Sequence, residues 1–207
     1  MKECKQCRQS KEKLFLKGER CDSSKCAMVR KPYAPGIHGK ETKRRKAISE
    51  YGIQLKEKRK LKSIYGLREK QLKNYVIKAL EKNDESTSAS LIRLIESRID
   101  NVLFRAGFGA SRSQTRQLIN HGHVLVNKKR LTASSHSGRI GDKINLKESS
   151  LKKGILQNID FKLKKHKPPE WLKINENKKE MEIISVPMID EDKIGINVNQ
   201  IIEFYLR

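Results

Sequence analysis

The chain has 207 residues, which is room for one ordinary domain or two small ones. Lys and Arg number 47 against 24 Asp and Glu, so the formal net charge is +23. Such a surplus repels itself in a free compact protein and requires a polyanion, with nucleic acid as the first candidate and an anionic membrane surface as the second. Hydrophobic residues make up only 36% of the chain, so we expect a modest core and some segments that order on binding.

A membrane surface fits the sequence less well than nucleic acid does. No apolar run approaches the roughly 18 residues that span a bilayer. The N-terminus lacks the apolar segment of a secretory signal, and Glu3 and Glu12 are acids of the kind that transit peptides avoid. We therefore expect a cytoplasmic protein, or one made inside an organelle, with no membrane partner.

The positive charge is unevenly spread along the chain. The net charge is +9 in residues 1–50, +5 in 51–100 and +7 in 101–150, but only +2 in 151–207. We expect the anion-binding surface in the first three quarters. The last quarter is then left to pack on the protein itself or to meet a protein neighbour.

In chain order, the first forty residues read as irregular, because cysteines, prolines and glycines interrupt any periodicity. Helix-forming residues begin near Glu41, and Gly66 is expected to end that helix. A second helix is predicted over 68–82, where Leu72 and Val76 belong to an apolar series at helical spacing. A polar linker follows.

The segment from about 90 to 150 is predicted to form two helices and a hairpin. An apolar stripe over 91–103 indicates a third helical region that Gly107 closes. Ser111 and Gln114 have the spacing of a capping box, so Ser111 is expected to open a short helix and Gly122 to end it.

Beyond Gly122 the apolar period changes from helical to alternating. Residues 123–127 predict a strand, 128–131 (KKRL) a turn, and the stretch after Gly141 and Asp142 a second strand.

The tail reads as a proline-punctuated loop with the single Trp, then a strand over 178–187 and a short terminal helix over 197–207. The fold class predicted from these elements is α+β.

The four cysteines form a C-x2-C pair and a C-x4-C pair, namely Cys4, Cys7, Cys21 and Cys26. Two closely spaced thiol pairs joined by a short loop are what tetrahedral metal ligation needs, and nearby lysines and arginines would help to hold the thiolates. We predict a structural Zn²⁺ that folds a segment with little core of its own. A four-Cys iron–sulfur cluster fits the same ligand set and is the alternative. Disulfides are disfavoured in a basic cytosolic chain, and unrelated buried thiols are disfavoured because all four cysteines fall within 23 residues. The set is complete without His38 and leaves no open position for catalysis.

Other short motifs fail as catalytic or nucleotide sites. The stretch GIHGKET lacks the spacing and the hydroxyl of a phosphate loop, and GFGASR lacks the third glycine of a dinucleotide fingerprint. His121 and His123 flank Gly122 without carboxylates nearby, which favours cap and strand residues near RNA over a catalytic pair. Since no nucleophile–base arrangement is present, we expect neither an enzyme nor a small-molecule substrate.

The segment 101–150 has the features of a phosphate-binding surface. Arg112 and Arg116 are one helical turn apart, Arg105 precedes them, and basic residues occupy the hairpin tip. Arginine suits this role because its fork donates two hydrogen bonds to one phosphate. Acids are nearly absent from this segment, whereas a merely solvated face would interleave them. The aromatic content of 5% favours folded RNA recognised through shape and backbone over stacked single strands.

These basic segments and the polar residues beside them supply the candidate RNA contacts. They are Lys40, Lys43, Arg44, Arg45, Lys58, Arg59, Lys62, Arg68, Lys70, Arg105, Ser111, Arg112, Arg116, His121, His123, Lys128 and Lys129, with Arg130 at the same hairpin tip.

The stretch ESRIDNVLFRAGFGASRSQTRQLINHGHVLVN resembles the helix–helix–hairpin RNA-binding module of small-subunit ribosomal protein four. The four-Cys start, PGIHG, YGIQLKEKRKLKSIYGLREKQ, PPEWL and the terminal IIEFYLR resemble that family in the same order. The likeness covers nearly the whole chain. Lys128 departs from it, since a Gly is common at that position.

The resemblance implies a structural constituent of the small ribosomal subunit that binds the multi-helix junction in the 5′ domain of its 16S-type ribosomal RNA and nucleates assembly. It also implies contacts with ribosomal protein five and with messenger RNA where it enters the ribosome, and hence a part in translational accuracy. It further implies a cytoplasmic or organellar ribosome as the location.

The resemblance also implies a domain plan: a four-Cys metal-binding segment at 1–40, a helical domain at 41–90 completed by 186–207, and the inserted RNA-binding module at 91–185. Two other hypotheses remain open at this point. One is an RNA-modifying enzyme with the same module, and the other is a metal-dependent regulator that binds DNA.

Overall fold

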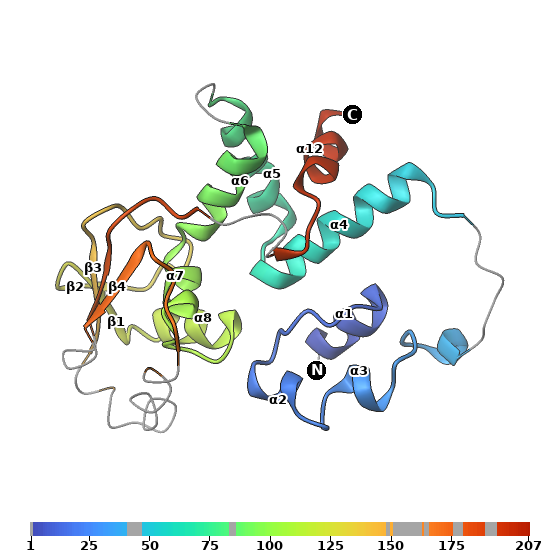
Figure 1. Ribbon diagram of the computed structural model, residues 1–207, viewed down its shortest axis with the longest axis horizontal. Helices are drawn as coiled ribbons and strands as arrows, with labels where there is room; N and C mark the ends of the chain where they lie inside the picture. Colours follow the sequence, from blue (N-terminus) through green and yellow to red (C-terminus); the bar gives the residue numbers. More distant parts are fainter. Residues whose placement is uncertain are drawn as a thin grey trace. The chain divides into compact units, whose positions relative to one another are not determined.

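The computed structural model describes residues 2–40, 47–82, 86–147, 150, 163, 166–175, 180–188 and 194–207 (Figure 1). The chain divides into two compact units. Unit 1 is formed by Met1–Leu91 together with Ile189–Arg207, and unit 2 by Ile92–Met188. In sequence, unit 2 is therefore an insertion between the two parts of unit 1. The predicted α+β class is confirmed: the described part of unit 1 is helical, and unit 2 combines helices with a sheet.

The helices of unit 1 are α1 (Lys2–Ser10), α2 (Glu19–Asp22), α3 (Ala27–Arg30), the 3₁₀ helix η1 (Ile37–Lys40), α4 (Glu50–Tyr65), α5 (Glu69–Leu80) and α12 (Val198–Leu206). Helix α6 (Thr87–Glu96) spans the boundary in sequence between the units. None of the helices in the described ranges is long and apolar enough to cross a membrane.

The prediction of an irregular start was wrong for Lys2–Ser10, which is helical. Helix α1 carries an acid, Glu3, in its first turn and a base, Arg8, in its last turn, the order that stabilises a helix dipole. Its Cys4 and Cys7 lie three residues apart and so share one face. The two cysteines suggested an irregular metal-binding loop, although the other residues of this segment are mostly helix formers.

Helix α4 begins later than predicted within the described residues. Ser49 is its N-cap, and the Ser49 hydroxyl accepts from the Gly52 amide at 3.3 Å. The predicted stop at Gly66 is confirmed: this residue ends the helix in the left-handed region, at φ 60°. Helix 68–82 and the terminal helix 197–207 are confirmed as α5 and α12.

Helix α12 packs on α4 and α5 and completes the core of unit 1, which includes Leu61, Leu72, Val76 and Ile201.

A polar cluster lies at the junction of α4, α5 and α12. Glu69 accepts hydrogen bonds from Lys58 Nζ at 2.9 Å, Lys62 Nζ at 2.5 Å and Tyr205 Oη at 2.7 Å. The Lys58 ammonium also lies 3.9 Å from the centre of the Phe204 ring. Although burial raises the pKa of Glu69, the hydrogen bonds from Lys62, Lys58 and Tyr205 outweigh it and lower this pKa to about 2. The cluster therefore ties the two ends of unit 1 together through one carboxylate.

Glu69→Gln is expected to destabilise unit 1 at neutral pH by about 0.5–1 kcal/mol, a small value because the carboxylate is half exposed to solvent. Because the pKa of Glu69 is lower in the folded than in the unfolded protein, the ionised carboxylate contributes stability at pH values above its unfolded pKa. This contribution is lost as the pH falls toward the folded pKa. The difference from wild type is therefore expected to vanish near pH 2. Chemical denaturation followed by circular dichroism at both pH values measures it. Glu81→Gln at the far end of α5 is the control, and an equal loss at both pH values would contradict the assignment.

Unit 2 contains α7 (Ile99–Arg105), α8 (Arg112–Asn120), β1 (Val124–Val126), β2 (Lys129–Leu131), β3 (Lys143–Leu146), β4 (Leu172–Asn175) and β5 (Glu180–Ile183). The described strands form one antiparallel sheet in the order β2-β1-β3-β5-β4. Its core joins Leu103 and Ile119 of the helices to Val124, Ile144 and Met181 of the sheet, so α7 and α8 pack against the sheet (Figure 1). The predicted strands at 123–127, after Gly141 and within 178–187 are confirmed.

The third helical region is broken where the sequence predicted one continuous stripe. Arg98 has an extended backbone at φ −66° and ψ 136°, and it forms a β-bridge with Ser137. The Ile99 amide donates to the carbonyl of His136 at 2.9 Å. The loop that contains His136 and Ser137 therefore takes over backbone pairing that would have continued α6 into α7. In α8, Ser111 is the N-cap as predicted, and its hydroxyl accepts from the Gln114 amide at 3.3 Å.

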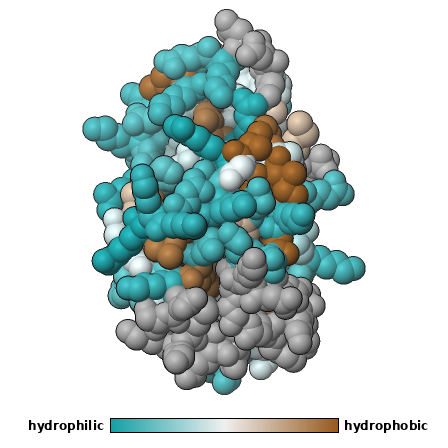
Figure 2. All heavy atoms as spheres, turned by 90° about the vertical axis from the view of Figure 1, so that its left-hand side faces the viewer, coloured by the Kyte–Doolittle hydropathy of each residue, from teal (hydrophilic) through white to brown (hydrophobic). Residues whose placement is uncertain are grey.

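The prediction of a turn over 128–131 was wrong in its position. The turn is formed by Asn127 and Lys128, with φ of 49° and 67°, and Lys129 already pairs with Val126. Two central residues with positive φ make the tight hairpin turn that suits the strand twist. Strand β2 was missed because it is an edge strand with mostly exposed, polar side chains. Hydrophilic side chains also dominate the coloured part of the face that Figure 2 shows.

Lys128→Gly is expected to stabilise unit 2 by about 0.5–1 kcal/mol relative to Lys128→Ala, because glycine adopts positive φ without strain. Both variants lose the same charge, so their unfolding midpoints isolate the backbone effect. Thermal unfolding of the two variants side by side provides the measurement. Equal midpoints would show that the turn is unstrained.

Candidate nucleic-acid interface

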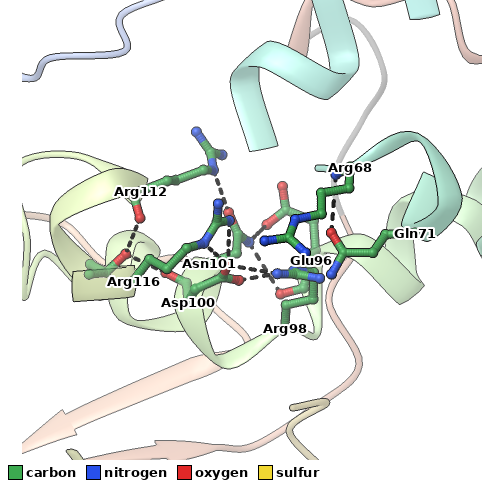
Figure 3. A network of polar contacts seen from close by, with 9 residues as sticks. Arg68, Gln71, Glu96, Arg98, Asp100, Asn101, Arg112 and Arg116 are labelled. Atoms are coloured by element: carbon green, nitrogen blue, oxygen red, sulfur yellow. Dashed lines mark hydrogen bonds and ion pairs between the residues drawn. The ribbon is translucent and has the colours of Figure 1, made fainter. Parts of the chain in front are cut away.

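The predicted basic helix face is present, and it is held together by carboxylates that the sequence analysis did not single out. Arg105 comes from α7, and Arg112 and Arg116 come from α8, one turn apart. Asp100 and Glu96 lie beneath these arginines (Figure 3 labels Arg112, Arg116 and both acids). The site therefore has two layers, with buried carboxylates below and partly exposed arginines above.

Asp100 binds two arginines at once. Arg98 donates from Nε to Oδ1 at 3.0 Å and from Nη2 to Oδ2 at 2.8 Å, a two-point contact. Arg116 donates from Nε and Nη2 to Oδ2, at 3.1 and 2.6 Å. The Thr115 hydroxyl donates to the Asp100 carbonyl at 2.7 Å and so fixes α8 against the start of α7.

Glu96 organises the other half of the cluster. Arg105 donates to it from Nε at 3.1 Å and from Nη2 at 2.7 Å. The Asn101 side-chain amide also donates to the Glu96 carboxylate, and the Asn101 oxygen accepts from Arg112 Nε at 2.7 Å. The Arg112 guanidinium lies 4.4 Å from the centre of the Phe104 ring. Asn101 therefore links the Glu96 carboxylate to the arginine at the start of α8.

Burial separates the two layers of charge. The Glu96 and Asp100 side chains are 0% and 3% exposed, whereas Arg105 and Arg116 are 29% and 27% exposed. Buried carboxylates are rarely found without partners, because an unpaired buried charge costs several kcal/mol. A signal existed in the sequence: Glu96, Arg98 and Asp100 alternate in charge just before the acid-poor segment. The net charge of residues 51–100 does not reveal this pattern.

Among the remaining candidates of unit 2, Ser111 caps α8 directly before Arg112, whereas the histidines and the hairpin lysines lie beyond the other end of that helix. His121 is exposed at the end of α8, and its ring centre lies 5.9 Å from that of His123. The His123 Nδ1 is 2.8 Å from the Ser150 hydroxyl. Lys128 and Lys129 are exposed at the hairpin tip, beyond the other end of β1. The structure therefore brings the arginines together but not the histidines and the hairpin lysines with them.

The candidates of unit 1 divide into exposed and internally paired residues. Arg59, Arg68 and Lys70 are exposed on α4 and around the start of α5, and Lys40 is exposed with its ammonium 5.5 Å from the centre of the Tyr33 ring. Lys58 is buried and, like Lys62, binds Glu69 as described above. Three further candidates lie outside the described residues: Lys43, Arg44 and Arg45.

The four cysteines line one cavity, together with Leu16, Lys17 and other residues of the N-terminal segment. The Lys17 amide donates to Cys21 Sγ at 3.3 Å. Burial raises the pKa of the Cys7 thiol, and the nearby sulfurs of Cys21, Cys4 and Cys26 raise it further against a backbone hydrogen bond from Leu14 that lowers it. Four thiols around one cavity, with backbone donors to two of the sulfurs, fit a tetrahedral thiolate centre in number and chemistry.

Within the part of the chain that the structure describes, no three His, Cys, Asp or Glu side chains are grouped as they would be to hold a metal ion. The structure thus gathers the thiols that the sequence paired, and it does not itself show a metal centre.

Comparison with known proteins gives a consistent result over the whole chain. Residues 1–96 match the family described as ribosomal protein S4/S9 N-terminal domain, and residues 97–144 match the S4 domain. Proteins named small ribosomal subunit protein uS4 are similar throughout. The protein of Syntrophomonas wolfei is 42% identical over 99% of the chain and 96% of its own length. That of Kosmotoga olearia is 42% identical over 98% of the chain and 95% of its own length. That of Natranaerobius thermophilus is 40% identical over 99% of the chain and 96% of its own length.

Proposed function

The chain belongs to the family of the small ribosomal subunit protein uS4, and from this we propose that it is a ribosomal-RNA-binding constituent of the small subunit and not an enzyme. The observation that carries the proposal is the arginine cluster of α7 and α8, which lies in a chain of net charge +23 that is similar to uS4 over nearly all its length. Arginine forks bind phosphate oxygens through paired hydrogen bonds, and folded RNA presents those oxygens at fixed spacing.

The more specific proposal is that the chain binds the multi-helix junction in the 5′ domain of 16S-type ribosomal RNA and nucleates assembly. Arg105, Arg112 and Arg116 would grip phosphates from unit 2, and Lys128 and Lys129 would add contacts at the hairpin tip. Ser111, His121 and His123 are proposed to contact RNA beside them. Exposed residues proposed to contact RNA from unit 1 are Lys40, Arg59, Arg68 and Lys70.

The near-neutral last quarter supports a protein neighbour at that end of the chain. Ribosomal protein five is the proposed protein partner. The chain is also proposed to contact messenger RNA where that RNA enters the ribosome. Both contacts would link the chain to translational accuracy. The ribosome in question would be cytoplasmic or organellar. An RNA-modifying enzyme with the same module is not favoured, because the relatives that match the chain end to end are named as ribosomal proteins.

We propose further that Cys4, Cys7, Cys21 and Cys26 hold a structural Zn²⁺, with an iron–sulfur cluster as the alternative. The shared cavity and the backbone donors to sulfur support this. Bound zinc would cross-link α1 to α2, which contains Cys21, and to Cys26 at the start of α3. These segments bury few large apolar side chains.

Cys21→Ser is expected to abolish stoichiometric metal in protein purified without air and to lower the helical signal of the N-terminal segment. Metal analysis and circular dichroism measure the two effects, and visible absorption separates a cluster from zinc. Met28→Leu, which changes another residue lining the cavity, is the control and should keep the metal. Wild-type protein without metal would refute the proposal.

RNA binding is tested by measuring the affinity of the chain for the small-subunit junction RNA over a range of salt concentrations. The logarithm of the affinity should fall linearly with the logarithm of salt. Lys129→Ala should reduce that slope by about 1, as expected for one lost phosphate contact. Lys173→Ala, from the near-neutral quarter, is the matched control and should leave the slope unchanged. A flat salt response, or equal binding to an unrelated folded RNA, would overturn the assignment.

A further inference from the structure

We propose that Glu96 and Asp100 are positioning residues for RNA recognition, and this rests on the proposed function. Their buried carboxylates hold the guanidinium groups of Arg105 and Arg116 in one orientation before RNA arrives. These acids would thus strengthen binding to a polyanion although they carry negative charge themselves.

The contact geometry supports this role. Each of the two arginines meets its carboxylate through both Nε and Nη2, at 2.6 to 3.1 Å. Contact through two donors restrains the plane of the guanidinium as well as its position. The acids are themselves restrained: Glu96 by the Asn101 side chain, and Asp100 by Arg98.

At Asp100 a counter-ion is already present without Arg116, namely Arg98, whose side chain is 2% exposed. The additional cation, Arg116, is 27% exposed and comes from the next helix. Four guanidinium groups, including Arg112, gather around two carboxylates, so the cluster keeps an excess of positive charge.

Fixing the arginines in advance lowers the entropy that is lost when RNA binds. A flexible arginine loses rotamer freedom when it binds a phosphate, and this loss weakens binding. In this cluster the loss occurs during folding instead. Binding then depends on the orientation of the cations as well as on their number.

The two explanations predict opposite signs for Glu96→Gln. Charge alone predicts tighter binding, because a negative charge is removed beside the site. Positioning predicts weaker binding by about threefold to tenfold for the released arginine. Glu170→Gln removes the same charge from an exposed position and is the control, which should bind as well as wild type or slightly better.

The affinity of each full-length variant for the junction RNA is measured under conditions where circular dichroism shows a folded protein. Arg116→Lys serves if Glu96→Gln does not fold: it keeps the charge, loses the two-point contact, and should weaken binding with an unchanged salt slope. The inference is overturned if Glu96→Gln folds and binds RNA as tightly as wild type or more tightly. If only Arg116→Lys folds, the same result with that variant overturns it. Failure of the wild type to prefer the junction RNA would instead refute the proposed function.

Discussion

Two buried carboxylates under a layer of arginines are the constraint on which unit 2 depends. Glu96 and Asp100 join the end of α6 and the start of α7 to residues of α7 and α8. A protein with a net charge of +23 must concentrate cations on one surface without driving its own helices apart. Placing the neutralising charge beneath the surface solves this, because the arginines are held and remain partly exposed. The same carboxylates, together with Thr115, fix α7 against α8.

Unit 1 meets a related demand with a different arrangement. There a single half-exposed carboxylate, Glu69, accepts hydrogen bonds from Lys58, Lys62 and Tyr205, which come from both sequence parts of unit 1. The aromatic side chain of Phe204 shields the Lys58 ammonium. Some of the positive charge in the sequence thus serves cohesion, and net charge by itself overstates the surface offered to RNA.

Local signals in the sequence predicted the elements whose causes are local. Ser111 caps α8 and Gly66 ends α4 because a hydroxyl acceptor and a left-handed residue act within one turn. The break at Arg98 could not be predicted in this way, because its cause is a β-bridge to Ser137, far along the chain. The same holds for the site: Arg112 and Arg116 were visible from their spacing, whereas the role of Asp100 appears only when α7 and α8 are packed.

The discontinuous composition of unit 1 has a consequence for the order of events during synthesis. Unit 2 is one continuous stretch, Ile92–Met188, so all of its partners are available before the last residues are made. The core of unit 1 also needs α12, which follows that whole stretch. The segment synthesised first is therefore completed last. Until α12 packs on them, the surfaces of α4 and α5 that it covers remain exposed to solvent, whereas the inserted unit can already fold.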